Sequence, residues 1–270
     1  MTTGRTPQHA LAAVYDEGAA AYEEYWAPAL HRHTLDLVNM VSSAAAPASR
    51  TVVDVATGCG TLVPALRGLA GSGGRVIALD RSQGMLRRVP GSVPRVQADA
   101  AALPLRAASA DVLVLAFVLF LLHDARQAVA EAARVLRPGG WLLIATWGTQ
   151  LRTATDVVVS EELDAVGAPS FAVIERSDSL TDTPDRLAVL LGGPFNNIDI
   201  SSRPLAATFD PRAALALKTG WGGVSWRYRQ LDPASQQAVH RRAAKRLSAL
   251  PPEDFIDWSE VLLTSARRTR

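Results

Sequence analysis

The middle of the chain alternates short apolar runs with segments whose apolar residues recur at helical spacing. Apolar runs typical of buried strands cover residues 51–55, 75–79, 112–116 and 141–146, and a shorter run covers 95–97. Helical signals begin after Gly60, Ser82 and Asp124, and Ser82 and Asp124 are the expected N-caps. This alternation predicts an α/β fold with a parallel, doubly wound sheet and helices on both faces.

The flanking segments follow other patterns. Residues 8 to about 40 predict a helical segment, which an Ala/Ser/Pro linker at 42–49 joins to the first strand. Beyond residue 150, three predicted helices begin at Pro184, Pro211 and Pro233. Each is expected to be capped by an acidic residue, respectively Asp182, Asp210 and Asp232. Residues 197–201 and 260–266 alternate as strands do, so two more strands are predicted after the core.

A glycine-rich turn follows the first predicted strand and is the main functional signal. Gly58 and Gly60 can adopt positive φ and let a ligand approach the main chain closely. About 20 residues further, the run 76–79 ends in Asp80, where a carboxylate can accept hydrogen bonds from ribose hydroxyls. The glycine-rich turn and Asp80 together predict a nucleoside pocket. The dinucleotide fingerprint would require Gly or Ala where this chain has Val63, which argues against NAD.

Asp54, four residues before Gly58, begins a stretch that resembles the Asp/Glu-x-Gly-x-Gly-x-Gly signature of class I S-adenosylmethionine-dependent methyltransferases, with Ala56 in place of the first glycine. Over residues 50–147 the chain resembles the ubiquinone/menaquinone-biosynthesis branch of that family, through Leu103-Pro104, residues 109–112 and residues 134–140. The resemblance implies a Rossmann-like, seven-stranded methyltransferase sheet, mostly parallel with an antiparallel last strand. It also implies S-adenosylmethionine as cofactor and S-adenosylhomocysteine as product.

The resemblance further assigns the adenine contacts to the Asp99 carboxylate and the Ala100 backbone amide. The expected cofactor-binding residues are Asp54, Ala56, Thr57, Gly58, Gly60, Asp80, Arg81, Met85, Asp99, Ala100 and Phe117. We expect one methyltransferase domain over 1–270, with a helical cap at 1–45, a cofactor-binding core at 50–150, a substrate lid at 170–250 and the last strand at 255–270.

Methyl transfer from a sulfonium needs alignment and desolvation more than a dedicated base. His123 follows the fourth core strand, at the sheet edge where open α/β sheets bind ligands, and is the candidate base. His31 and His33 are further candidates, of which at most one faces inward. Four large side chains could contact a flat, apolar acceptor or fill the core instead: Trp26, Trp147, Trp221 and Trp226.

Composition narrows the classes of protein to which the chain could belong. The 270 residues are 48% hydrophobic and 20% charged, without an apolar run of the roughly 18 residues that a membrane helix needs. The polar N-terminus lacks the apolar core of a signal peptide, so we expect a cytoplasmic protein. The single cysteine, Cys59, excludes an internal disulfide and a multi-cysteine zinc site, and no metal is expected. We expect a small-molecule partner and a monomer or homodimer.

Three functions fit these observations. The first is methylation of oxygen or carbon on a small, apolar or aromatic metabolite, such as a quinone or polyketide. The second is a cyclase or isomerase that binds the same cofactor without net methyl transfer. The third is an RNA methyltransferase, favoured by the basic segments 226–229 and 241–246 but opposed by a formal net charge of only +2.

Overall fold

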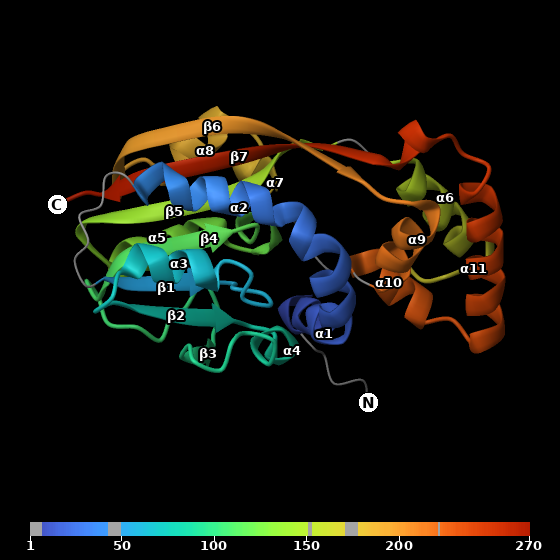
Figure 1. Cartoon of the computed structure of the whole chain (residues 1–270), viewed down its shortest axis with the longest axis horizontal. Coiled ribbons are helices and arrows are strands. Elements are labelled where there is room, and N and C mark those ends of the chain that lie inside the picture. The colour runs from blue at the N-terminus through green and yellow to red at the C-terminus, as the bar shows by residue number, and fades with distance from the viewer. Residues whose placement is uncertain (1–6, 43–49, 151–152, 171–177, 221) are drawn as a thin grey trace. The chain divides into compact units, whose positions relative to one another are not determined.

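The computed structural model describes residues 7–42, 50–150, 153–170, 178–220 and 222–270 (Figure 1). Its seven-stranded sheet has the order β3-β2-β1-β4-β5-β7-β6. The strands are β1 (Thr51–Val55), β2 (Arg75–Asp80), β3 (Arg95–Gln97), β4 (Ala110–Ala116), β5 (Leu136–Gln150), β6 (Phe195–Thr208) and β7 (Ile256–Arg268). The first five strands pair in parallel, and β7 is antiparallel. The predicted Rossmann-like methyltransferase sheet is confirmed.

The central strands are buried on both faces, which is why they read as continuous apolar runs. Val52 on β1 lies opposite Val76 on β2 and Val112 on β4, and all three are buried. The fifth strand begins earlier than its predicted start at residue 141. A first pairing joins Ala110 to Leu136, and after a register shift regular pairing resumes between Val112 and Trp141.

The sheet is flanked by α2 (Ala27–Ser42), α3 (Val63–Ala70), α4 (Gln83–Leu86), α5 (Ala125–Val135), α7 (Asp178–Thr181), α8 (Pro184–Leu191) and the 3-10 turn η2 (Leu119–Leu121). The predicted N-caps hold: Ser82 Oγ accepts from the Met85 amide at 3.0 Å, and Asp124 Oδ1 accepts from the Gln127 amide at 2.9 Å. The acidic cap expected for α8 is wrong. Thr183 accepts from the Arg186 amide, because Asp182 lies one residue too early and pairs with the Arg186 side chain instead.

The chain folds into two compact units. The sheet unit comprises Leu30–Thr149, Glu175–Arg203 and Glu260–Arg270. The helical unit comprises Met1–Ala29, Gln150–Ile174 and Pro204–Ser259. Residues 178–203, which we expected in the lid, therefore lie on the sheet. The physical reason is their apolar packing: Leu187, Leu191 and Phe195 are buried in the same cluster as Val53 and Leu142 of the central strands.

The helical unit is built from α1 (Pro7–Ala21), the π-helical turn η1 (Tyr22–Trp26), α6 (Ala154–Ala165), α9 (Pro211–Gly220), α10 (Gly222–Arg229), α11 (Pro233–Leu247) and the 3-10 turn η3 (Pro252–Phe255). It has its own core, in which Val159 and Leu163 of α6 pack with Leu215, Val239 and Leu247. The unit thus buries apolar surface independently of the sheet.

Candidate functional site

The glycine turn at the carboxyl end of β1 adopts a left-handed backbone at three alternating positions. Ala56, Gly58 and Gly60 have φ of 56°, 57° and 80°. The chain bends sharply here, and the Thr57 amide donates to the Leu79 carbonyl of β2 at 2.9 Å. A side chain at position 60 would meet the neighbouring loop, since a Cβ there would lie 3.2 Å from Val89 Cα. The turn therefore requires glycine at this position for both its backbone and its packing.

Asp80, at the carboxyl end of β2, links this turn to the next loop. Its Oδ2 accepts from the Gly58 amide at 2.8 Å, and its Oδ1 accepts from the Ser82 amide at 2.8 Å. A carboxylate oxygen can accept more than one hydrogen bond. The side chain is half-buried, so the carboxylate is held in a fixed orientation without being enclosed.

Asp54 lies beneath the turn and is 2% exposed. Burial raises the pKa of its carboxyl group to about 7, and the negative charge of Asp80 adds to that shift. The Thr57 hydroxyl opposes the shift by donating to Asp54 Oδ2 at 2.7 Å. Asp54 therefore supports the turn from below and changes its charge near neutral pH.

The loop after β3 carries the residues expected at the adenine. Asp99 forms an ion pair with Arg81, and its Oδ1 accepts from the Ala101 amide at 3.0 Å. Both oxygens of the Asp99 carboxylate thus already have protein partners, and the ion pair joins the loops after β2 and β3. Ala100 is buried, and Met85 of α4 is fully buried. Sequence reasoning did not foresee that Arg81 would hold Asp99.

Phe117 directly follows β4 and has a left-handed conformation, with φ of 55°. Its amide donates to the Ala145 carbonyl of β5 at 2.7 Å, which fixes the backbone. Its ring lies 4.7 Å from the ring of Trp147, and Phe120 meets Trp147 edge-on at 6.4 Å. The carboxyl ends of β4 and β5 therefore carry an aromatic cluster, to which Trp147 contributes a nearly buried ring.

The histidines occupy different environments. His123 is exposed, just before the N-cap of α5. On α2, His33 is 7% exposed whereas His31 is only partly buried, in line with the expectation that at most one of them faces inward. Burial lowers the pKa of His33, although the nearby Asp36 carboxylate opposes that shift. The His33 ring is therefore neutral at pH 7.

The expected tryptophans do not share one unit. Trp147 belongs to the sheet unit, whereas Trp26 and Trp226 belong to the helical unit. Trp26 stacks on Phe209 with ring centres 6.2 Å apart, and Trp226 is half-buried on α10. Trp221 lies outside the described residues.

Both basic segments are engaged within the helical unit. On α11, Arg242 binds Glu162 at 2.6 Å, and Arg246 binds both Glu162 and its neighbour Glu161. Arg227 and Arg229 of α10 pair with Asp164 and Glu17 respectively. Paired arginines offer less charge to phosphates, which weakens the RNA hypothesis.

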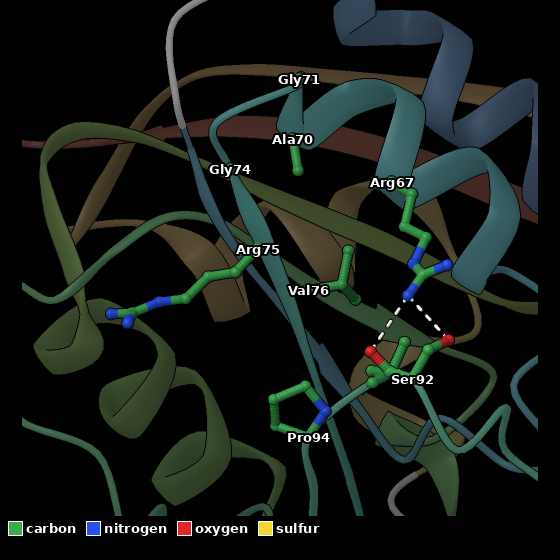
Figure 2. Close-up of a pocket in the computed structure, with 9 residues that line it drawn as sticks. Arg67, Ala70, Gly71, Gly74, Arg75, Val76, Ser92 and Pro94 are labelled. Atoms are coloured by element: carbon green, nitrogen blue, oxygen red, sulfur yellow. Dashed lines mark hydrogen bonds between the residues drawn. The ribbon is translucent and has the colours of Figure 1, made fainter.

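A hollow of about 320 Å³ lies at the opposite, amino-terminal edge of the sheet. Figure 2 shows Arg67 reaching Ser92, where its Nη2 donates to the carbonyl oxygen at 3.0 Å and to Oγ at 2.8 Å. Arg75 extends away from Ser92 (Figure 2). Its Nε donates to Thr51 Oγ1 at 3.3 Å. The hollow is separated from the glycine turn by the length of the strands and plays no part in that site.

The chain is similar to known methyltransferases. The methyltransferase-domain family matches residues 53–144. A demethylmenaquinone methyltransferase from Clavibacter sepedonicus is 34% identical over 249 residues, which cover 87% of this chain and 95% of that protein. The ubiquinone/menaquinone biosynthesis C-methyltransferase UbiE of Marinomonas sp. is 34% identical over 147 residues, covering 50% of this chain and only 58% of that protein.

The fold is also shared with a solved structure, the [4+2]-cyclase SpnF. The two superpose with a TM-score of 0.57 at 19% identity, over 98% of each chain. Among the helices that the structure describes, none combines the length and apolar character needed to cross a bilayer.

A Rossmann-like sheet with a glycine turn after β1 and a carboxylate after β2 defines a nucleoside-binding α/β protein. The chain belongs to the class I S-adenosylmethionine-dependent methyltransferases, in the branch that contains the ubiquinone/menaquinone methyltransferases. It is an enzyme whose cofactor is S-adenosylmethionine.

Proposed function

We propose that this enzyme transfers the methyl group of S-adenosylmethionine to oxygen or carbon of a small, largely apolar or aromatic acceptor, in quinone or specialised metabolism. The observation that supports this most strongly is the Asp80 carboxylate, which both the turn and the following loop hold at the end of β2. The relatives named above supply the quinone chemistry, which is a property of those proteins and a hypothesis for this chain. The cytoplasm remains the expected compartment.

Asp80 would accept hydrogen bonds from the two ribose hydroxyls of the cofactor. Since the Gly58 and Ser82 amides already orient both oxygens, little ordering entropy is lost when the ribose binds. The Arg81–Asp99 ion pair and the Ala100 amide would border the adenine. The methionine end would lie along the turn at residues 56–60.

The backbone amides of the turn are not the groups that would bind the methionine tail of the cofactor. Its Thr57, Gly58 and Gly60 amides already donate to Leu79, Asp80 and Thr57 respectively. Carbonyl oxygens of the turn are thus better suited to the ligand, and they match the donors of the α-ammonium group.

The acceptor would lie against the aromatic cluster of Phe117, Phe120 and Trp147. Aromatic rings favour flat, apolar acceptors and keep water away from the reacting sulfonium. His123 remains the candidate base for an acceptor that must lose a proton, with His33 as the neutral alternative. Trp26, Trp221 and Trp226 stay candidate acceptor contacts from the sequence.

Calorimetric titration of S-adenosylmethionine into Asp80→Ala tests the proposal. We expect at least a fivefold weaker affinity, about 1 kcal/mol, because charge-assisted hydrogen bonds to the ribose are lost. The control is Asp111→Ala, at the amino end of β4. Asp111 Oδ2 likewise accepts a hydrogen bond from a backbone amide, that of Thr51, at 2.8 Å. Equal affinities of wild type and Asp80→Ala would refute the ribose assignment.

The alternative is a cyclase or isomerase that keeps the cofactor intact, and the fold shared with SpnF makes it worth testing. The two functions differ in stoichiometry. A methyltransferase releases one S-adenosylhomocysteine per methylated acceptor, whereas a cyclase converts its substrate with none.

A further inference from the structure

Helix α10 presents a polar surface to the interior of the helical unit. Ser225 is completely buried. The structure describes every residue of α10, and none of the others is buried. Arg229 follows four residues later, with a side chain 29% exposed. Residues four apart on a helix share a face, with Cβ atoms about 5–6 Å apart. Because α10 packs against α1, α6 and α9, the hydroxyl and the guanidinium lie in the same interior region.

Three polar atoms on this face lack hydrogen-bond partners. They are Ser225 Oγ, Arg229 Nε and Arg229 Nη2, all buried and unpaired within the part of the chain that the structure describes. Nearly all buried polar groups in folded proteins are hydrogen-bonded. Three unpaired atoms on one helix face therefore point to a group that binds there.

The geometry of the guanidinium specifies that group. Nε–H and the adjacent Nη2–H form one side of the planar fork, and this side matches the two oxygens of a carboxylate. The remaining nitrogen, Nη1, lies 3.0 Å from Glu17 Oε2 of α1. Glu17 thus anchors the guanidinium from one direction and leaves the bidentate side for a ligand.

The neighbouring Arg227 shows what a purely structural arginine looks like in this unit. Its Nη2 donates to Asp164 at 2.5 Å and to the Ala168 carbonyl at 3.3 Å, and its Nε donates to the Pro169 carbonyl at 3.0 Å. The fold thus satisfies Nε and Nη2 of Arg227 internally. The same two atoms of Arg229 are left for something else.

We infer that Arg229 and Ser225 form a binding site for the carboxylate of a small molecule, with Arg229 as the bidentate donor and Ser225 as a third donor. The site lies within the helical unit alone, so the inference goes beyond the proposed function and does not depend on it. The guanidinium fork selects a carboxylate over a neutral group, which assigns the ligand to the class of small organic acids. Arg229 and Ser225 are binding residues, and neither takes part in the methyl transfer itself.

Titration of sodium benzoate into the full-length protein, without S-adenosylmethionine, tests the site. Saturable binding is expected for the wild type, at least tenfold weaker binding for Arg229→Gln, and about threefold to tenfold weaker binding for Ser225→Ala. Benzamide, the neutral isostere, should bind at least tenfold more weakly than benzoate. The matched control is Arg241→Gln, an equal charge change at an exposed position of α11, which should leave benzoate affinity unchanged.

Glu17→Gln separates ligand binding from a structural role, because it breaks the same ion pair while keeping the donors. Its benzoate affinity should stay within threefold of wild type. Absence of saturable benzoate binding would overturn the inference and leave the three atoms to bound water. So would equal losses in Arg229→Gln and Arg241→Gln, or a loss in Glu17→Gln as large as in Arg229→Gln.

A parallel titration with S-adenosylmethionine distinguishes this inference from the proposed function. Arg229→Gln should bind the cofactor within twofold of wild type. A tenfold loss would mean that the site holds the cofactor's own carboxylate, which overturns the assignment to a separate small acid. If wild type binds benzoate but no S-adenosylmethionine, the proposed function fails while the carboxylate site stands.

Discussion

Ala56 occupies a left-handed position that glycine fills in the family signature, and its φ of 56° carries a cost for any residue with a Cβ. The residue nevertheless fits, because the turn around it is fixed by the Thr57 and Gly58 hydrogen bonds to β2. The alanine therefore stores strain within the cofactor turn.

Ala56→Gly should stabilise the protein by roughly 0.5–1 kcal/mol, since relief of a left-handed alanine outweighs the added chain entropy of glycine. Urea unfolding measures the change. Ala108→Gly is the matched control, because Ala108 also has positive φ, 49°, but lies on an exposed loop. For comparison, Ala130→Gly within helix α5 should lose about 1 kcal/mol of stability. A similar loss in Ala56→Gly would contradict the claim that Ala56 is strained.

Asp54 should make stability depend on pH. Its folded pKa of about 7 lies above the ordinary 3.8, so the folded state binds the proton more tightly than the unfolded chain. The sign follows: wild type loses stability relative to Asp54→Asn as pH rises from about 4 to about 7, and the difference is constant above that range. The expected slope is at most about 1.4 kcal/mol per pH unit.

Urea unfolding of wild type and Asp54→Asn at several pH values measures this difference. Asparagine retains an acceptor for the Thr57 hydroxyl, so the comparison isolates the charge. A stability difference that stays flat between pH 5 and pH 7 would show that Asp54 ionises at its ordinary pKa.

At the scale of elements, helices α6 and α11 are joined by a half-buried ionic cluster. Glu162 is the centre, with a side chain 10% exposed between Arg242 and Arg246. Burial alone would raise the pKa of Glu162, but the hydrogen bonds from the two arginines outweigh it and hold the pKa below its usual range.

Glu162→Gln should cost about 1–3 kcal/mol of unfolding free energy, because two guanidinium groups lose their shared counter-charge at a partly buried position. The neighbouring Glu161→Gln is the control. Its side chain is 54% exposed, so its pair with Arg246 should contribute at most about 0.5 kcal/mol. Equal costs for the two variants, measured by urea unfolding, would argue against a special role for the buried glutamate.

The elements that sequence patterns predicted are those fixed by local chemistry. The runs that became β1 and β2, and the caps Ser82 and Asp124, follow from neighbouring residues alone. The start of β5 was placed too late because a register shift separates its first pairing, between Leu136 and Ala110, from the regular pairing that follows. Such a pairing depends on residues that are distant in sequence.

In the candidate site, too, features set by local sequence could be predicted and features set by distant contacts could not. The positions of the glycine turn and Asp80 could be predicted, because a strand followed by glycines or an acid is a local pattern. The Arg81–Asp99 pair and the unpaired atoms of Arg229 and Ser225 could not, since they depend on which loops and helices meet. Helix α10 itself was missed, as its two leading glycines disfavour a helical start.

At the scale of the whole molecule, the chain combines a sheet unit that carries the cofactor motifs with a helical unit that has its own core. The cofactor motifs lie entirely within the sheet unit, and the proposed carboxylate site lies entirely within the helical unit. Substitutions in the two units can therefore test cofactor binding and carboxylate binding separately.

The most direct measurement is a crystal structure of the enzyme with S-adenosylhomocysteine. We expect the ribose hydroxyls within about 2.6–3.2 Å of the Asp80 carboxylate oxygens, with the homocysteine tail along residues 56–60 and the sulfur facing the Phe117–Trp147 cluster. A nucleoside bound away from Asp80, or a glycine turn closed by side chains or occupied by a flavin or pyridine dinucleotide, would contradict it.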